Sequence, residues 1–382
     1  MKNRFKLIDV YLCVGILCTV AVFTALFVTN GEFLSEIVWD AKHDLFIDFT
    51  GCQGDYRGQV SYGFFYILGR FIPDGLIEDS QISRWSELFL VIFLVICVVI
   101  IQQIINDELN ESKGKKLLFL LLFFVSQPFA FACIKAGNTL FVSLMLMVAA
   151  MYLKEKPDAL SRETALLCIA LASDLKLAPA IFGLFYIREK RYKEAVRLLI
   201  YGLIFVVAPL FIFGGIDRYM EVLTEHAGLI SPRPETIVGV IIELSEVLGL
   251  GGEIGLKIGN ICSYAYLIMV VVFLFLHKRS WKPLFMMTTI LIIFLNMSYP
   301  YTLCYLIIPM VAFFEEERDN MNVKNGVYAV LLALIFTTYP LLRIDWPTAT
   351  FITNYFCLYI MVTVLSVDII IEIVRDRKKR DY

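Results

Sequence analysis

The chain has 382 residues, of which 59% are hydrophobic and only 18% are charged. A soluble domain is about 45–50% apolar and about 25% charged, so the composition excludes an ordinary soluble protein. The net charge of −2, without a basic face, argues against a nucleic-acid partner. The apolar residues form continuous blocks of roughly 17–22 residues, which is the length that a helix needs to cross a bilayer.

Ten of these blocks are each expected to cross the membrane once. The first follows Lys2, Arg4 and Lys6 and lacks a small-x-small cleavage site, so we expect a retained span rather than a signal peptide. The ten blocks are 7–28, 86–105, 117–134, 138–153, 196–214, 261–277, 283–298, 301–315, 327–343 and 352–372.

An eleventh apolar block, 164–187, is interrupted by Asp174, Lys176 and Pro179 and has basic clusters on both sides. Basic flanks mark cytoplasmic ends, so this block is predicted to enter the membrane and return as two short helices, with a break near Lys176. The fold class is therefore an all-α integral membrane protein, a polytopic bundle of about twelve helices in one transmembrane domain, 1–382.

The distribution of basic residues predicts the orientation of the bundle. With the N-terminus inside, the cytoplasmic segments hold 24 of the 34 Lys and Arg residues, so both termini are expected in the cytoplasm and the protein in the plasma membrane. Two long outer loops, 29–85 and 215–260, contain Val60–Ile72 and Thr236–Leu250, which resemble amphipathic helices on the membrane surface. The cytoplasmic loops are short and carry no phosphate-binding motif, so no cofactor is predicted.

Two carboxylates in the first outer loop are candidates for catalysis. Asp44 and Asp48 are four residues apart and share one face of a helix, where each raises the pKa of the other and one can act as a general base. Alternatively, they only solubilise the loop. His43 lies beside them, and the three side chains are an alternative site for a hard cation, but no metal is predicted.

Lys176 is the second candidate, because an ionisable group inside an apolar block is costly and usually functional. It would lie at the outer tip of the broken hairpin, where a cation can hold a phosphate. The alternatives are a pair with Asp174 or a side chain that snorkels to water. Further polar residues are expected to line an outer site: Asn138, Arg218, His226, Arg233, Tyr299, Tyr301 and Arg343.

Three stretches resemble glycosyltransferase family 87, a branch of the GT-C superfamily of membrane glycosyltransferases. They are Asp44-Leu-Phe-Ile-Asp48-Phe49, Lys135-Ala-Gly137-Asn138, and Lys176-Leu-Ala-Pro179 with the basic run after it. The Lys-x-x-Pro hairpin is the most specific match, and the resemblance covers about residues 7–310. The family usually has Tyr-Pro-Pro where this chain has Ser61-Tyr62-Gly63, so the prolines are missing.

The resemblance implies a GT-C-like fold and a hexosyl- or pentosyltransferase of a bacterial cell envelope. Such an enzyme moves a sugar, mannose or similar, from a polyprenyl-phosphate donor to an outer-face glycan or glycolipid acceptor, with inversion. By the match to the Asp-Phe motif, Asp48 is expected to be the base, with Asp44 second. Lys176 is the leading ligand of the donor phosphate, and Arg218, Arg233 and Arg343 are weaker candidates.

Two other functions remain open from the sequence. Broken helices with a charge at the break also suit a lipid or solute transporter or a flippase. No inverted repeat is visible, however, and the acidic pair lies in an outer loop. The missing prolines also fit a non-catalytic partner in envelope polysaccharide synthesis.

Overall fold

The structure of the chain is a computed structural model that describes residues 5–28, 84–130, 138, 140–213, 232–277, 280–294, 299–336, 343–345 and 350–380. Its contacts group the chain into two compact units. The first comprises 1–39, 108–130 and 231–382, and the second comprises 40–107 and 131–230. Each unit is described by itself below.

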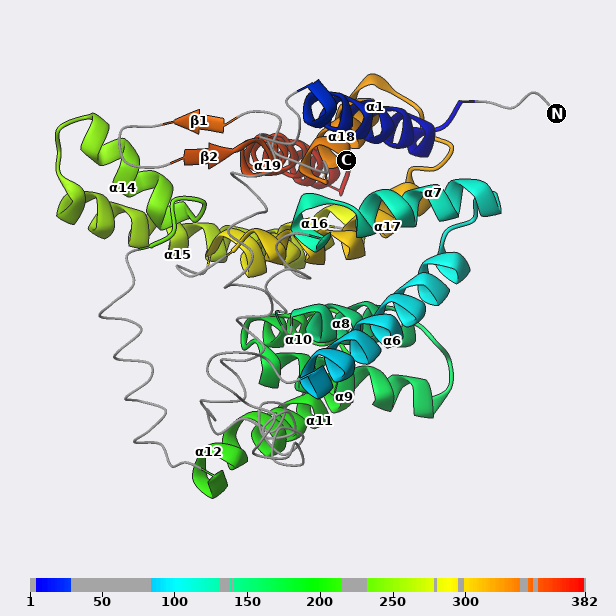
Figure 1. The fold of residues 1–382 in the computed structure, drawn as a ribbon. Coiled ribbons are helices and arrows are strands. Elements are labelled where there is room, and N and C mark those ends of the chain that lie inside the picture. The colour runs from blue at the N-terminus through cyan, green and yellow to red at the C-terminus, as the bar shows by residue number, and fades with distance from the viewer. Residues whose placement is uncertain are drawn as a thin grey trace. The chain divides into compact units, whose positions relative to one another are not determined.

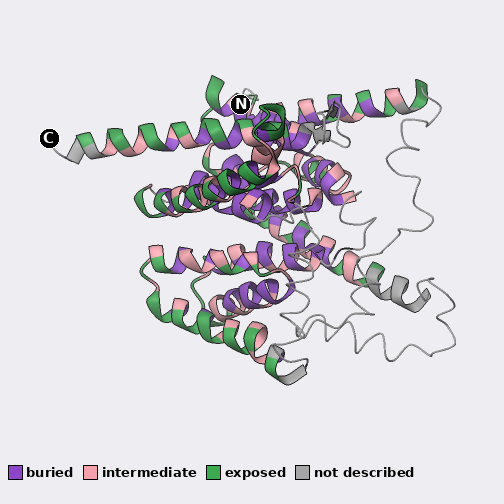
Figure 2. Cartoon of the chain, turned by 90° about the vertical axis from the view of Figure 1, so that its left-hand side faces the viewer, coloured by how far each residue is buried: buried purple, intermediate pink, exposed green. Residues whose placement is uncertain are grey.

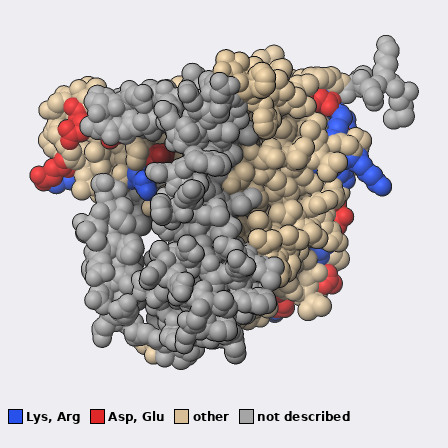
Figure 3. Space-filling view, in the orientation of Figure 1, with Lys and Arg blue, Asp and Glu red and all other residues tan. Residues whose placement is uncertain are grey.

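The described residues are almost entirely helical, which confirms the predicted all-α polytopic membrane fold (Figure 1). Helices long and apolar enough to cross a membrane occur at Leu7–Ala25, Val91–Glu108, Gly252–Leu276 and Asn354–Asp376. The last of these has buried and exposed residues alternating along its length (Figure 2), as expected of a helix with one face on a protein core. Over the described surface in Figure 3, charged side chains lie in a few groups separated by broad uncharged areas.

The first unit is a helical bundle with one small hairpin of strands. Its elements are α1 (Leu7–Val28), α7 (Lys113–Phe124), α14 (Ile237–Val247), α15 (Gly252–Leu276), α16 (Trp281–Thr289), η4 (Ile290–Phe294), η5 (Pro300–Leu306), α17 (Ile307–Glu316), α18 (Val323–Ile335), β1 (Arg343–Asp345), β2 (Thr350–Ile352) and α19 (Thr353–Arg380). Among the described residues, the antiparallel strands, which pair Arg343 with Ile352, are the departure from the predicted all-helical chain. The rings of Tyr11, Phe119 and Phe314 join α1, α7 and α17 at centroid distances of 5.4–5.9 Å.

Helices α14 and α15 form a tight antiparallel hairpin within this unit (Figure 1). The turn between them contains Gly249 and Gly251, whose positive φ angles of 71° and 85° suit glycine. A Cβ on Gly255 would lie 2.8 Å from the Cα of Ile242, and one on Gly259 would lie 3.0 Å from the Cα of Val238. The pair of glycines, spaced as in GxxxG, therefore lets the two backbones approach closely.

The second unit contains the predicted broken hairpin. Its elements are α6 (Arg84–Glu108, which ends at the unit boundary), α8 (Leu140–Leu153), α9 (Ala159–Leu175), η2 (Ala178–Phe182), α10 (Gly183–Arg188), α11 (Tyr192–Gly202), η3 (Leu203–Val207) and α12 (Ala208–Phe213). Helix α9 packs on α8 and α11, and α10 packs on α11. The break near Lys176 is confirmed.

Several predicted ends of spans are wrong. The span at 117–134 is α-helical only to Phe124, because Pro128 lacks the N–H that a continuing helix needs. The span at 261–277 begins at Gly252, since the hairpin with α14 extends the helix beyond its apolar block. The span at 301–315 begins as a 3₁₀ turn at Pro300. Hydropathy locates apolar segments, but caps and prolines set the ends of helices.

Candidate functional site

Lys176 lies at the C-terminal end of α9, where the chain leaves the helix. Its φ and ψ of −146° and 112° are extended, although its N–H still donates to the Ala172 carbonyl at 2.9 Å. The Ser143 hydroxyl of α8 also donates to that carbonyl, at 3.3 Å, and so fixes the end of α9. Pro179 then opens the 3₁₀ turn η2. The break is thus built from local chemistry, and it leaves the Lys176 side chain half-buried at the tip of the hairpin.

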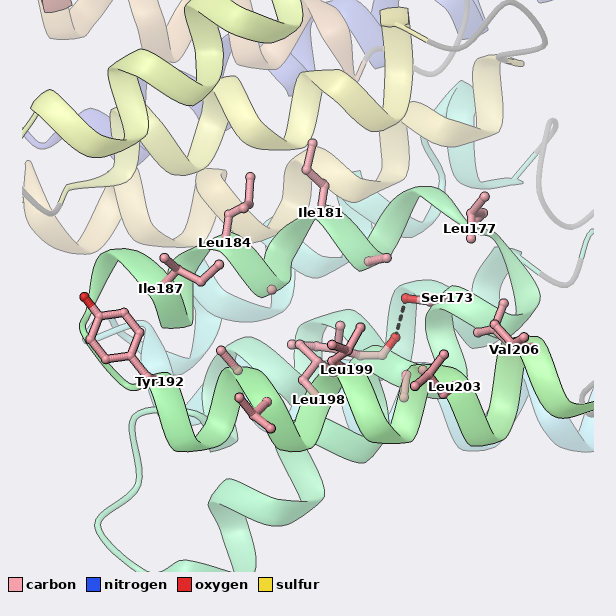
Figure 4. Close-up of a pocket in the computed structure, with 18 residues that line it drawn as sticks. Ser173, Leu177, Ile181, Leu184, Ile187, Tyr192, Leu198, Leu199, Leu203 and Val206 are labelled. Carbon is pink, nitrogen blue, oxygen red and sulfur yellow. Dashed lines mark hydrogen bonds between the residues drawn. The ribbon is translucent and has the colours of Figure 1, made fainter.

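An apolar groove begins beside Lys176. Leu177 and Val206 lie at one end of it and Ile187 and Tyr192 at the other (Figure 4), with the η2–α10 segment on one side and α11 and η3 on the other. The groove has a volume of about 810 Å³. That lies within the range of about 300–1,000 Å³ for ligand pockets. Leu177 is 62% exposed, so the groove opens to the surface of the chain. An apolar ligand or a lipid chain suits it.

A network of ion pairs holds the end of the groove far from Lys176. The buried ammonium of Lys154 contacts the Glu189 carboxylate at 2.5 Å, and the Arg191 guanidinium donates to the Lys154 carbonyl at 3.1 Å. Arg191 also pairs with Glu194 of α11. These contacts fix the turn between α10 and α11, where Lys190 has a positive φ of 59°. The two walls of the groove are therefore tied together at this end.

A second polar group lies in the first unit, just before α14. The Arg233 guanidinium lies over the Tyr299 ring at 4.3 Å, and Tyr299 stacks on Tyr301 with centroids 5.3 Å apart and an interplanar angle of 15°. The Arg233 guanidinium also forms a hydrogen bond with the Tyr299 side chain, which raises its pKa, and it makes no ion pair with any described residue. The stack and this hydrogen bond hold the guanidinium in place, and its remaining N–H groups are available for a ligand.

Glu235 lies two residues after Arg233 and was not predicted. Burial raises the pKa of its carboxyl, and a hydrogen bond from its own backbone together with the nearby charge of Arg233 only partly offsets that increase. Oε2 of Glu235 is buried and accepts no hydrogen bond in the described part of the chain. The Tyr359 hydroxyl of α19 donates to the Glu235 main-chain carbonyl at 2.8 Å and anchors the turn. The sequence offered no signal beyond a glutamate before a helix cap.

The other predicted residues have varied outcomes. Asn138 lies just before α8, where its Oδ1 accepts from the Leu140 N–H at 2.9 Å. Arg343 begins β1. The remaining candidates lie outside the described residues: His43, Asp44, Asp48, Arg218 and His226. Their roles stay predictions.

The predicted residues that the structure describes fall in two units. Lys176 and Asn138 belong to the second unit, whereas Arg233, Tyr299, Tyr301 and Arg343 belong to the first. The structure therefore brings Arg233 together with the two tyrosines, and it brings Lys176 together with the groove. Within the described ranges, no three His, Cys, Asp or Glu side chains are grouped as a metal site.

Comparison with known proteins gave one finding. No curated protein and no solved structure matches the chain. The family model of glycosyltransferase family 87 matches residues 68–309, which is more than half of the sequence and includes α6, α9, the groove and the Arg233 stack. The chain is therefore a membrane protein that belongs to glycosyltransferase family 87.

Proposed function

We propose that this protein moves a hexose or pentose, such as mannose, from a polyprenyl-phosphate donor to a glycan or glycolipid acceptor at the outer face of the plasma membrane. Membership of glycosyltransferase family 87 supports sugar transfer. The observation that carries the choice of donor is the position of Lys176. It directly precedes Leu177, which lies at one end of the apolar groove. A cation beside an apolar groove matches a phosphate with a long hydrocarbon tail.

The groove is suited to the prenyl tail because it is almost purely apolar and open along its side. Leu199 and Leu203 of its α11–η3 wall are 64% and 51% exposed, so a chain can enter from the surrounding lipid. With both termini in the cytoplasm, as the charge distribution favours, Lys176 lies toward the outer face. The donor is then lipid-linked, since nucleotide sugars are cytoplasmic.

The proposed reaction is a single displacement at the anomeric carbon. Asp48, or Asp44 in its place, accepts the proton of the acceptor hydroxyl. The hydroxyl oxygen forms a bond to the anomeric carbon while the bond from that carbon to the phosphate oxygen breaks. The polyprenyl phosphate leaves with the electron pair, and the Lys176 ammonium stabilises the charge that develops on it. Attack opposite the leaving group inverts the configuration.

A substitution of Lys176 tests the donor site. Purified protein in lipid nanodiscs is given a polyprenyl-phosphate mannose with a radiolabelled sugar and a membrane glycolipid extract as acceptor. Lys176→Met removes a charge-assisted hydrogen bond worth about 1.5–3 kcal/mol, which predicts a roughly 10- to 150-fold lower kcat/KM. Lys193→Met is the matched control, because Lys193 is exposed in the same unit. Equal losses in both variants, or none in Lys176→Met, would reject this assignment.

Substitution of the two aspartates tests the base. Asp48→Asn removes the proton acceptor while keeping the shape of the side chain, so transfer is expected to fall by at least 100-fold. Asp44→Asn is made in parallel, and the larger loss identifies the base. Full activity in both variants contradicts this role. Accumulation of the sugar inside sealed vesicles without transfer would instead show a transporter.

A further inference from the structure

The polar group before α14 is not used by the donor site proposed above. It consists of Arg233, Glu235, Tyr299 and Tyr301, which we call the Arg–Glu cluster. Arg233 offers the N–H groups of a planar guanidinium that remain after its hydrogen bond to the Tyr299 side chain, and it makes no ion pair among the described residues. Glu235 offers a carboxylate whose Oε2 lacks a donor among the described residues. A strong donor with N–H groups to spare and a carboxylate with one unsatisfied oxygen therefore lie two residues apart.

The cluster is held rigidly by its backbone. The Thr236 hydroxyl donates to the Arg233 carbonyl at 2.7 Å and accepts from the Gly239 N–H at 3.1 Å, so that it caps α14. A Cβ on Gly239 would lie 1.9 Å from the same carbonyl oxygen, so only glycine fits there. The Tyr359 hydroxyl holds the Glu235 carbonyl from α19. Such fixed groups lose little entropy when a ligand binds.

The chemistry of the cluster distinguishes between ligands. A phosphate would be attracted by Arg233 but repelled by the carboxylate of Glu235. A sugar hydroxyl both donates and accepts hydrogen bonds, so it can donate to Glu235 while a neighbouring hydroxyl accepts from the guanidinium. The buried Oε2 favours a ligand that brings donors, because an unsatisfied buried acceptor is costly. A neutral polyhydroxylated ligand fits both groups.

We propose that the Arg–Glu cluster binds a neutral saccharide, with Glu235 accepting from one hydroxyl and Arg233 donating to another. The inference rests on the proposed function for one point, that this saccharide is part of the acceptor glycan rather than the donor. It also reassigns Arg233, which the sequence suggested as a weak phosphate ligand, to sugar hydroxyls. Lys176 then remains the phosphate ligand.

The test measures binding without relying on transfer. Protein in nanodiscs is mixed with methyl α-D-mannopyranoside or methyl α-D-glucopyranoside, and saturation transfer from protein to sugar is recorded by NMR. We expect a signal from at least one glycoside in the wild type and an at least fivefold smaller one in Arg233→Lys and Glu235→Gln. The control is Glu253→Gln with Lys257→Met, an exposed ion pair on α15 of the same unit. Thermal unfolding checks that each variant is folded.

Two outcomes would overturn the proposal. One is a saturation-transfer signal that is absent in the wild type or equal in folded Arg233→Lys and Glu235→Gln. The other is binding of inorganic phosphate, seen as ³¹P line broadening, that depends on Arg233 and is strengthened in Glu235→Gln. Failure of the proposed function is separable: no transfer from any polyprenyl-phosphate sugar, with glycoside binding intact, rejects the transferase but retains the saccharide site.

Discussion

The substitution Gly239→Ala tests whether the turn before α14 is as tightly built as the structure indicates. The added Cβ would lie 1.9 Å from the Arg233 carbonyl oxygen, 2.6 Å from its carbon and 2.8 Å from the Cα of Pro234. All three are backbone atoms, so no side-chain rotation relieves the contact. The turn must open, and the hydrogen bonds that Thr236 makes to the Arg233 carbonyl at 2.7 Å and 3.0 Å must lengthen or break.

The expected cost of Gly239→Ala follows from these contacts. Overpacking costs about 1–3 kcal/mol, and loss of the helix cap costs about 0.5–2 kcal/mol more. A total of about 1.5–5 kcal/mol lowers the Tm by roughly 3–20 °C for a unit of this size. The displaced Arg233 should also lose glycoside binding, which links the fold of the turn to the Arg–Glu cluster.

The assay is thermal unfolding in nanodiscs, followed by circular dichroism at 222 nm. Gly326→Ala is the matched control, because a Cβ on Gly326 meets no heavy atom within 4 Å. Gly326 lies in α18, so alanine there should be neutral or stabilising by up to about 1 kcal/mol. If Gly239→Ala has the Tm of the wild type and binds methyl glycosides equally well, the close approach and the reasoning from it are wrong.

Three other measurements follow from the structure. Burial raises the pKa of the Glu235 carboxyl on folding, so the folded state loses stability as the pH rises above the ordinary pKa of a glutamate. Glu235→Gln should therefore raise the Tm by a few degrees at pH 7.5 and leave it unchanged at pH 4. Lys154→Met removes a buried cation from Glu189 and should cost about 3–5 kcal/mol, whereas Lys193→Met should leave the Tm unchanged. Leu203→Trp narrows the groove, so kcat/KM should fall severalfold for an undecaprenyl donor but not for a ten-carbon prenyl donor. Equal effects on both donors would show that the groove does not bind the prenyl tail.

Much of the fold could be predicted because lipid imposes a strong pattern on sequence. The break at Lys176 was visible from a lysine and Pro179 inside one apolar block with basic residues on both sides. A helix was also predicted within Thr236–Leu250, where α14 lies, but its packing against α15 was not predicted. Gly255 and Gly259, which bring α14 against α15, carry no hydropathy signal. Contacts that depend on small residues and distant partners require the structure.

The candidate site was harder to predict. Lys176 was identifiable because a charge in an apolar block is expensive wherever the chain folds. Glu235 lies in a polar stretch of the sequence, where a glutamate gives no signal of a functional role. Its surroundings depend on Tyr359, which lies 124 residues away in the sequence. The groove beside Lys176 could not be predicted either, because the sequence of its walls indicates only apolar helices.

The contrast between Glu235 and two paired carboxylates in the described part of the chain supports its role as a binding group. Glu189 is paired with Lys154, and Asp368 is paired with Lys282 at 2.6 Å and with Lys324 at 2.9 Å. In those networks each carboxylate has a cation within contact distance, so their burial is compensated inside the protein. Glu235 has a hydrogen bond from its own backbone and the more distant charge of Arg233, whose guanidinium lies on Tyr299, and its Oε2 has no donor among the described residues. A carboxylate oxygen kept buried without a donor lowers stability, and a hydroxyl-bearing ligand that donates to this oxygen offsets that cost when it binds.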